Sequence, residues 1–458
     1  MNLRLGVDVA CRAAHQASCT DDTGKFLWAG HRFRTDPGDL DVLWAKLPAG
    51  DREVTVIMEP TRNAWVPLAA WFRRHGATVV MVPPEQSADL RDYYNKHAKS
   101  DRLDSKVLAR LPLLHPEGLT AETGIGPGDA LKRAVKIRSG LVHRRTTSMQ
   151  RLDCLLELMG PAWVGAIGSD MCKTAFRLLS RYANPRTVRQ LGKRRLTDFL
   201  HRSSRGAWAE ERATEIIAAA TTTIELWGDE FDFDELAADI ATEARLALSL
   251  CEEISKMDKR IGALYAKADP AGIVRSAPGV GVVGAPQIHG RLGDAKRFRN
   301  LAGVRSFSGL VPRRDDSGHT ATAGGPTKAG DACLREALFT SADHARKIDP
   351  TLAQRYHRLM TVEGKHHNSA LCHIATVLLT RIAACLRADQ PYQLRDIDGT
   401  PITETEGRVI VADRYTVPKA TRTARRAATT TSRQPRRNER AEKGVAERSE
   451  APPVPTPA

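Results

Sequence analysis

Hydrophobic and polar positions in the first 110 residues alternate between the short period of strands and the longer period of helices. A helical pattern at residues 65–75 ends at Gly76, the residue type that most often closes a helix. Strand-like apolar runs occur at residues 3–10, 16–19, 25–29, 54–60 and 78–84. Because three of these runs precede any long helix, the pattern predicts an α/β domain in which a meander leads into a mixed sheet.

From about residue 126 to residue 268 the pattern becomes helical. Segment 240–264 carries two interleaved apolar series with a seven-residue step: Ile240, Ala247, Ile254 and Ile261, and Leu250, Met257 and Leu264. Such a seam is typical of a coiled coil or a long packed helix pair. Glu243 interrupts the second series, which leaves an intramolecular pair open. We nevertheless expect the seam to serve oligomerisation, because exposed apolar seams usually find a partner.

Residues 269–400 form a further predicted domain, with a Gly-rich hairpin at 276–284 and amphipathic helices after it. The apolar segment 370–386 contains a histidine and an arginine, so it is predicted to be a buried helix rather than a membrane span. Beyond about residue 413, Thr, Ala, Arg and Pro dominate, which is typical of a disordered tail. The predicted organisation is therefore α/β plus all-α, with domains at 1–125, 126–268 and 269–400 and a largely disordered basic tail at 401–458.

The charge of the chain favours a nucleic-acid partner. Its formal net charge is +15, and clustered Lys and Arg release counterions from a phosphate backbone. Solvated helix faces or an acidic protein partner would give the same charge. The candidate contacts lie in the basic helical segment 129–160 and around residues 309–330: Arg133, Arg144, Arg145, Arg313, Arg314 and Lys328.

Cysteine spacing and the amino terminus limit the remaining classes. The eight cysteines include no C-x-x-C pair, so neither a zinc module nor a disulfide framework is predicted. The first residues lack the basic and apolar segments of a secretory signal. We therefore expect a cytoplasmic protein that does not associate with a membrane.

Four acidic residues suggest a metal site. Asp8 lies in the first strand run and Glu59 closes the run at 54–60, so a parallel pairing of these strands places both carboxylates at one sheet edge. Asp101 and Asp104 are three residues apart, which puts them on one face of a helix. Hard cations such as Mg²⁺ prefer oxygen ligands, and two such ions can clamp the oxygens of a phosphodiester displacement. The alternative for each acid alone is a capping or surface role.

Ser317 is the candidate nucleophile. It lies in the polar segment 309–320, "GLVPRRDDSGHT", and no G-x-S-x-G elbow surrounds it, which disfavours an ordinary esterase. A turn serine is the alternative, whereas the functional interpretation is a hydroxyl on a flexible loop among arginines that hold a phosphate. Downstream, "GGPTKAG" adds Lys328 and a helix start of the kind that binds anions.

Two weaker motifs complete the set. "PGVG" at 278–281 is similar to the hairpin of helix-hairpin-helix modules, whose backbone N–H groups grip a DNA phosphate, although a plain turn fits as well. His366 and His367 are adjacent and point apart on a helix, so we expect them to pack or to contact DNA rather than to bind a metal.

The ordered motifs over residues 3–400 resemble one known family. "GVDVA", "MEPT", "KSDRLDS", "PGVG", "SGLVP", "TKAGDACLREAL" and "GKHHNSALCHIATVLL" follow one another as in the DEDD-type insertion-sequence transposases of family one hundred and ten, which include the Piv-like DNA invertases. The resemblance implies a RuvC-like N-terminal domain of RNase H-type fold, a coiled-coil linker and a C-terminal transposase domain that carries a catalytic serine.

The same resemblance implies roles and partners. Asp8, Glu59, Asp101 and Asp104 match the acids that bind Mg²⁺, and Ser317 matches the serine that attacks DNA and forms a covalent phosphoserine link. Family members use a structured non-coding RNA that pairs with donor and target DNA. They assemble as tetramers in which acids and serine come from different subunits, so we expect a homo-oligomer, from dimer to tetramer.

Two departures and two alternatives remain. Thr327 stands where many relatives have a serine, so that serine's role is not carried over, and the tail has no counterpart that we can assign. A RuvC-like metal-dependent nuclease would cut branched DNA with the four acids alone, without a covalent intermediate. A non-enzymatic RNA-binding protein is less favoured, because all four acids are present.

Overall fold

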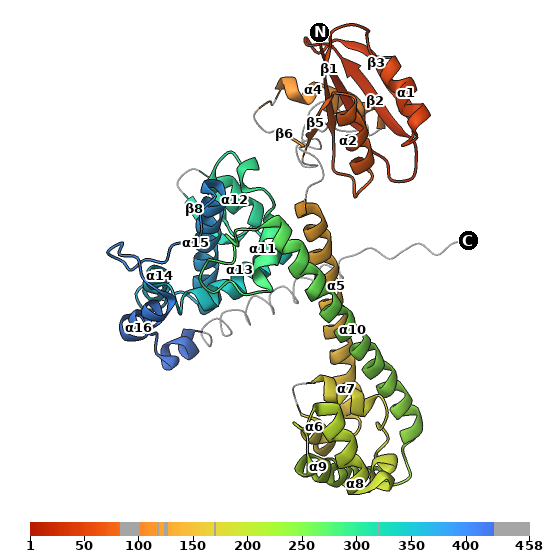
Figure 1. Cartoon of the computed structure of the whole chain (residues 1–458), viewed down its shortest axis with the longest axis vertical. Coiled ribbons are helices and arrows are strands. Elements are labelled where there is room, and N and C mark those ends of the chain that lie inside the picture. Colours follow the sequence, from red (N-terminus) through yellow and green to blue (C-terminus); the bar gives the residue numbers. More distant parts are fainter. Residues whose placement is uncertain are drawn as a thin grey trace, which may run out of the picture. The chain divides into compact units, whose positions relative to one another are not determined.

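The computed structural model describes residues 1–82, 101–114, 116, 119–122, 127–168, 171–317 and 320–425. The side chains of residues 101, 120, 127, 314–317 and 320–324 lie outside this description. The chain divides into two compact units, Met1–Gly126 and Pro127–Ala458, which we describe separately (Figure 1).

The first unit is built on a six-stranded sheet with the order β3-β2-β1-β4-β5-β6. β1 pairs antiparallel with β2 and parallel with β4, and β5 continues the parallel part. The strands are β1 (Asn2–Asp8), β2 (His15–Thr20), β3 (Phe26–Phe33), β4 (Glu53–Met58), β5 (Thr78–Met81) and β6 (Thr120–Ala121). The predicted meander, the mixed sheet and the parallel pairing of the first and fourth strands are therefore confirmed.

Helices cover both faces of this sheet. On one face α1 (Pro37–Ala45) and α2 (Trp65–Arg74) share a core with the apolar residues of β1, and α2 ends before Gly76, as predicted. On the other face, α4 (Asp101–Leu114) packs Leu108 and Leu111 against Ile57 of β4. Each such leucine removed from water stabilises the fold by about 2 kcal/mol, so apolar contact holds α4 on the sheet.

The second unit begins with the long helix α5 (Pro127–Glu157), which lies along the longer helix α10 (Phe233–Ala268) (Figure 1). Shorter helices lie between them in the sequence: α6 (Pro161–Ile167), α7 (Lys173–Leu179), α8 (Pro185–Ser204) and α9 (Glu210–Trp227). The seam residues Ile240, Ala247, Leu250, Ile254 and Ile261 are buried by packing within the chain. The seam therefore does not support oligomerisation, and the intramolecular pair that Glu243 left open is the correct interpretation.

The rest of the second unit is mainly helical. Its elements are α11 (Gly284–Leu292), η2 (Ala295–Arg297), α12 (Leu301–Ser308), β7 (Pro312–Ser317), β8 (Thr320–Pro326), α13 (Ala332–Ala345), α14 (Pro350–Thr361), α15 (His367–Ala388) and α16 (Glu404–Arg414). The Gly-rich segment 276–284 forms turns that lead into α11. By length and composition α15 could cross a membrane, but it contributes a continuous apolar face to the core, as predicted for a buried helix.

One part of the predicted tail is ordered. Thr403 and Glu406 form a reciprocal capping box at the start of α16. Gly407 packs closely against the turn that precedes α14. An added Cβ at Gly407 would lie 2.2 Å from the Ile348 carbonyl oxygen. The expectation of disorder is therefore wrong for residues 404–414, because local capping, this close contact and the buried side chain of Val411 hold the helix. Residues 426–458 lie outside the described residues.

Candidate active site

Two of the predicted acids lie at adjacent strand ends. Val7 pairs with Met58 in the parallel ladder of β1 and β4. Asp8 comes directly after Val7 and Glu59 directly after Met58, so the two acids are neighbours at the carboxyl edge of the sheet. Both side chains are half-buried. The sequence placed Asp8 inside a buried strand, but β1 ends at Asp8, and the chain then turns so that the Ala10 N–H donates to His15 Nδ1 at 3.1 Å.

A glycine brings α4 onto the same face. Gly6 is two residues before Asp8, so both belong to one side of the pleat. A Cβ at Gly6 would lie 2.2 Å from the Ser105 carbonyl oxygen and 2.3 Å from the Ala109 nitrogen. A hydrogen bond of 2.8 Å between the hydroxyls of Ser18 and Ser105 fixes the helix further. No residue larger than glycine fits between β1 and α4 without moving the helix.

The direction of α4 places its first turn at the carboxyl edge. Near its other end, Arg110 Nε donates to the Gly24 carbonyl at 3.3 Å, in the β2–β3 turn beside the amino end of β1. Asp104 immediately precedes Ser105, so it lies between the Gly6 contact and the carboxyl edge of the sheet. Its side chain is half-buried. The fold thus brings Asp8, Glu59 and Asp104 to one region of the first unit.

The fourth acid is placed only through its backbone. Asp101 is the first residue of α4, one turn before Asp104, and its side chain lies outside the described residues. Among the side chains that the structure describes, no group of three His, Cys, Asp or Glu is close enough to hold a metal ion. Sequence reasoning found the acids but missed Gly6 and the hydrogen bond between Ser18 and Ser105. The only sequence signal for the close contact was a glycine two positions before Asp8.

Ser317 belongs to the second unit, so the structure does not place it relative to the acids. Its backbone ends β7, where it pairs with Thr320 of β8. The expectation of a flexible loop is therefore wrong: antiparallel pairing from Pro312 to Ser317 makes this segment a hairpin. The Ser317 side chain lies outside the described residues.

The base of this hairpin is closely packed. Thr327 donates its backbone N–H to Val311 O at 2.8 Å and its hydroxyl to Gly309 O at 3.3 Å. Gly309 has φ +67°, and a Cβ there would lie 2.9 Å from the Ala329 carbonyl oxygen. A left-handed conformation and this close approach both require glycine. Thr327 thus joins the two ends of the hairpin that carries Ser317.

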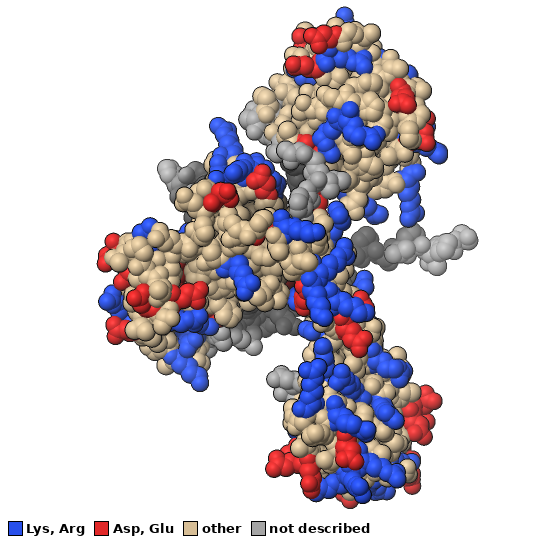
Figure 2. All heavy atoms as spheres, in the orientation of Figure 1, with Lys and Arg blue, Asp and Glu red and all other residues tan. Residues whose placement is uncertain are grey.

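Basic side chains gather along the helical part of the second unit (Figure 2). Arg133 and Arg144 on α5 are exposed, and Arg145 is half-buried. Arg313 is exposed and donates to Thr327 O at 3.3 Å. Lys328 is exposed with φ +56° at the hairpin base, and the Arg314 side chain lies outside the described residues.

The helix start after Lys328 differs from the prediction. α13 is capped by Asp331, whose carboxylate accepts from the Leu334 N–H at 2.9 Å and pairs with Arg291. Burial alone would raise the pKa of Asp331, but the hydrogen bonds from Arg291 and the Leu334 backbone outweigh burial and lower that pKa. The N-terminus of α13 is therefore occupied by the protein's own carboxylate rather than open to an anion.

The two adjacent histidines have structural roles. His366 caps α15 by accepting the Asn368 N–H at 3.2 Å. His367 is buried and shares a 2.7 Å hydrogen bond with the Tyr356 hydroxyl. Of the two roles expected for this pair, packing or DNA contact, the structure shows packing for His367 and helix capping for His366.

Two family models and several relatives match this chain. The DEDD transposase model of the IS110 type matches residues 5–161, and the model described as "Transposase IS116/IS110/IS902 family" matches residues 271–358. The insertion element IS110 43.6 kDa protein of Streptomyces coelicolor is 25% identical over 402 residues, covering 85% of this chain and 95% of its own length.

Two further relatives carry functional names. The transposase for insertion sequence element IS1111A of Coxiella burnetii is 28% identical over 345 residues, covering 74% of this chain and 76% of that protein. The pilin gene-inverting protein of Moraxella bovis is 28% identical over 128 residues, covering 27% of this chain and 39% of that protein. The family resemblance is thus found at both ends of the chain, and this protein belongs to the DEDD transposases of the IS110 family, enzymes of DNA transposition.

Proposed function

We propose that this transposase cuts and rejoins DNA through a covalent link to Ser317, with Asp8, Glu59, Asp101 and Asp104 as Mg²⁺ ligands. One observation carries most of the proposal: Asp8 and Glu59 end neighbouring parallel strands, and Gly6 lets α4 bring Asp104 onto the same face. An antiparallel β1–β3 meander beside parallel β4 and β5 supports the RuvC-like, RNase H-type fold that the family resemblance implies.

The donor set fits a hard divalent cation, because all four proposed ligands are carboxylates. When bound there, Mg²⁺ neutralises charge that develops on the phosphodiester oxygens. The half-buried positions of Asp8, Glu59 and Asp104 keep these carboxylates in a partly desolvated edge, where electrostatic interactions are stronger than in bulk water. Rigid elements on both sides hold them, which is what a site for phosphodiester chemistry requires.

The covalent step is a transesterification. The Ser317 hydroxyl oxygen attacks the phosphorus, forms a new O–P bond, and gives its proton to a base or to water. The bond from phosphorus to the leaving deoxyribose oxygen breaks, and that oxygen takes up a proton. A DNA hydroxyl then attacks the phosphoserine in reverse, which restores the serine and joins a new strand without net hydrolysis.

Three further features belong to the same proposal. A structured non-coding RNA selects donor and target DNA by base pairing, which leaves backbone shape and a short core to the protein. A homo-oligomer completes the site, with acids from one subunit and Ser317 from another. The enzyme acts in the cytoplasm. These features rest on the family resemblance.

Trapping of a protein–DNA adduct tests the proposal. Full-length protein is incubated with Mg²⁺, end-labelled DNA carrying its element's ends, and RNA transcribed from the flanking non-coding segment, and is then denatured. We expect labelled DNA to migrate with the protein, and the adduct to disappear in Ser317→Ala but persist in Ser306→Ala, an exposed serine of α12. Cleavage without an adduct, unchanged in Ser317→Ala, would instead favour the RuvC-like nuclease.

A further inference from the structure

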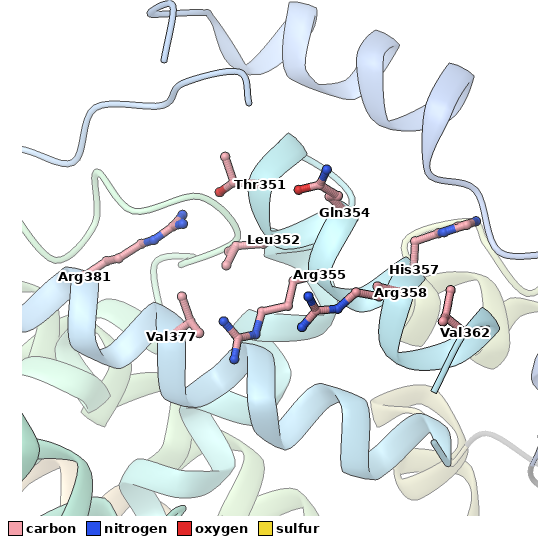
Figure 3. Close-up of a pocket in the computed structure, with 9 residues that line it drawn as sticks. All are labelled: Thr351, Leu352, Gln354, Arg355, His357, Arg358, Val362, Val377 and Arg381. Atoms are coloured by element: carbon pink, nitrogen blue, oxygen red, sulfur yellow. The ribbon is translucent and has the colours of Figure 1, made fainter. Parts of the chain in front are cut away.

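A cavity of about 500 Å³ lies between α14 and α15 in the second unit (Figure 3). Its lining comes from α14, from Val362 just beyond it, and from the part of α15 around Val377 and Arg381. None of these residues belongs to the candidate active site. A volume of this size lies within the range of about 300–1,000 Å³ that is typical of small-molecule pockets.

Arginines dominate the charged lining of the cavity. Arg355, Arg358 and Arg381 line it, whereas the described lining residues include no Asp or Glu. Arg381 is held by Asp349 Oδ2 at 3.1 Å and by the Tyr392 hydroxyl at 2.7 Å. The Arg381 charge is therefore compensated within the protein.

Arg355 is not compensated in this way. Within the part of the chain that the structure describes, its guanidinium makes no hydrogen bond and no ion pair, and Arg358 is paired only with Glu363, at 3.3 Å. Arg355 and Arg358 are one helical turn apart, and both guanidinium groups extend into the same space (Figure 3). Two neighbouring like charges on one face repel each other, so the arrangement is stabilised when an anion lies between them.

The surroundings reinforce this positive potential. His373 lies one turn before Val377 on α15. Burial is the main cause that lowers the His373 pKa, and the positive charges of Lys365 and Arg355 lower it further, against a smaller opposite effect of Glu363. Adding a further proton near Arg355 is therefore unfavourable, whereas adding a negative group is favourable.

The remaining lining fits a nucleobase. Val377 gives the cavity an apolar wall, and the amide of Gln354 can both donate and accept hydrogen bonds. Arginine planes stack on unpaired bases, as aromatic rings do. A phosphate alone would use a small part of this volume, and a base that is stacked inside a duplex could not enter it. Phosphate recognition next to an apolar wall thus matches a single unpaired nucleotide.

We propose that the α14–α15 cavity binds one unpaired nucleotide of a nucleic-acid strand, with Arg355 and Arg358 on its phosphate and its base against Val377. The inference rests on the proposed function in one respect only, that the protein acts on DNA. It adds a subsite that prefers strands with an unpaired region over continuous duplex.

Binding of two DNA hairpins of equal charge tests this subsite, one blunt and one with a short unpaired 3′ overhang. Full-length protein in the Ser317→Ala background is titrated at physiological salt, with fluorescence anisotropy as the readout. The variants are Arg355→Gln, Val377→Trp to fill the cavity, and Arg408→Gln as the charge-matched control on α16, where Arg408 is exposed and pairs with Glu404 at 3.7 Å. Arg355 is exposed, so its variant remains informative even if Val377→Trp does not fold.

We expect Arg355→Gln and Val377→Trp to weaken binding of the overhang hairpin about tenfold, while the blunt hairpin changes less than about twofold. Arg408→Gln should change neither. Equal weakening of both hairpins, or no weakening, would overturn the subsite, as would tighter binding of free adenosine monophosphate than of the overhang. Since this background carries no Ser317 hydroxyl, failure of the covalent mechanism cannot alter the result, and the two failures remain distinguishable.

Discussion

Replacement of Gly6 by alanine tests how α4 is positioned over the acidic edge. The new Cβ would lie 2.2 Å and 2.3 Å from backbone atoms of Ser105 and Ala109, where ordinary contacts begin at 3.4 Å. Neither neighbour is a flexible side chain, so the helix must retreat by roughly 1 Å. That movement also stretches the 2.8 Å hydrogen bond between Ser18 and Ser105.

The energetic cost follows from these contacts. Overpacking of this kind destabilises a core by about 1–3 kcal/mol, to which a weakened buried hydrogen bond adds about 1 kcal/mol. Together these costs amount to about 2–4 kcal/mol, and the lower end corresponds to amide exchange about 30-fold faster in residues 101–114. Because a 1 Å displacement of a catalytic group can cost about 100-fold in rate, we expect strand exchange to fall by about that factor while DNA binding is retained.

Hydrogen exchange by mass spectrometry and a strand-exchange assay measure the two effects on the same preparation. Gly140→Ala is the matched control, since nothing lies within 4 Å of its added Cβ, and it should slightly stabilise α5. If Gly6→Ala changed neither the exchange of residues 101–114 nor the reaction, α4 would not hold Asp104 at this edge, and the proposed metal site would lose its structural basis.

Three further predictions concern the second unit. Gly309→Ala, which puts a Cβ 2.9 Å from the Ala329 carbonyl oxygen at φ +67°, should reduce strand exchange at least about tenfold in a single-turnover assay, whereas Gly325→Ala, with open space around it, should not. The buried carboxylate of Asp269 accepts hydrogen bonds from the Tyr265 hydroxyl and from the N–H groups of Ile273 and Val274, at 2.6, 2.9 and 3.0 Å. Asp269→Ala should therefore lower the free energy of unfolding by about 3 kcal/mol in urea titrations, and an unchanged midpoint would refute this. Burial lowers the pKa of His289 below 6.5, so the unfolded chain binds a proton at a higher pH than the folded chain does. The free energy of unfolding should therefore fall as the pH falls below 6.5, by up to about 1.4 kcal/mol per pH unit. His289→Leu should reduce this slope, and an equal slope in the variant would contradict the assignment.

The sequence predicts the first unit well because its signals are local. Apolar alternation sets each strand, and β1 pairs with β4 in the parallel sense that the prediction of a metal site assumed, which puts Asp8 and Glu59 at neighbouring strand ends. The length of β1 is less local: its ladder ends at Asp8 because the chain turns there to His15. The contact between Gly6 and α4 joins residues about 100 positions apart and leaves no periodic trace in the sequence.

The second unit shows where periodicity is ambiguous. A seven-residue seam has the same pattern whether its partner is another copy or a second helix of the same chain, and here α5 supplies the partner for α10. The Ser317 segment is polar throughout, so its sequence resembles a loop, although antiparallel pairing makes it a hairpin. The helix α16 escaped prediction because one capping box, one glycine contact and the single buried valine Val411 hold it rather than a continuous apolar face.

The most direct test of the account identifies the residue that is linked to DNA. The trapped adduct is digested with trypsin and nuclease, and the peptide that carries a residual nucleotide is sequenced by tandem mass spectrometry. We predict that the nucleotide is attached to Ser317. Attachment to another residue, such as Thr327, or cleaved DNA with no modified peptide at all, would contradict the covalent serine mechanism.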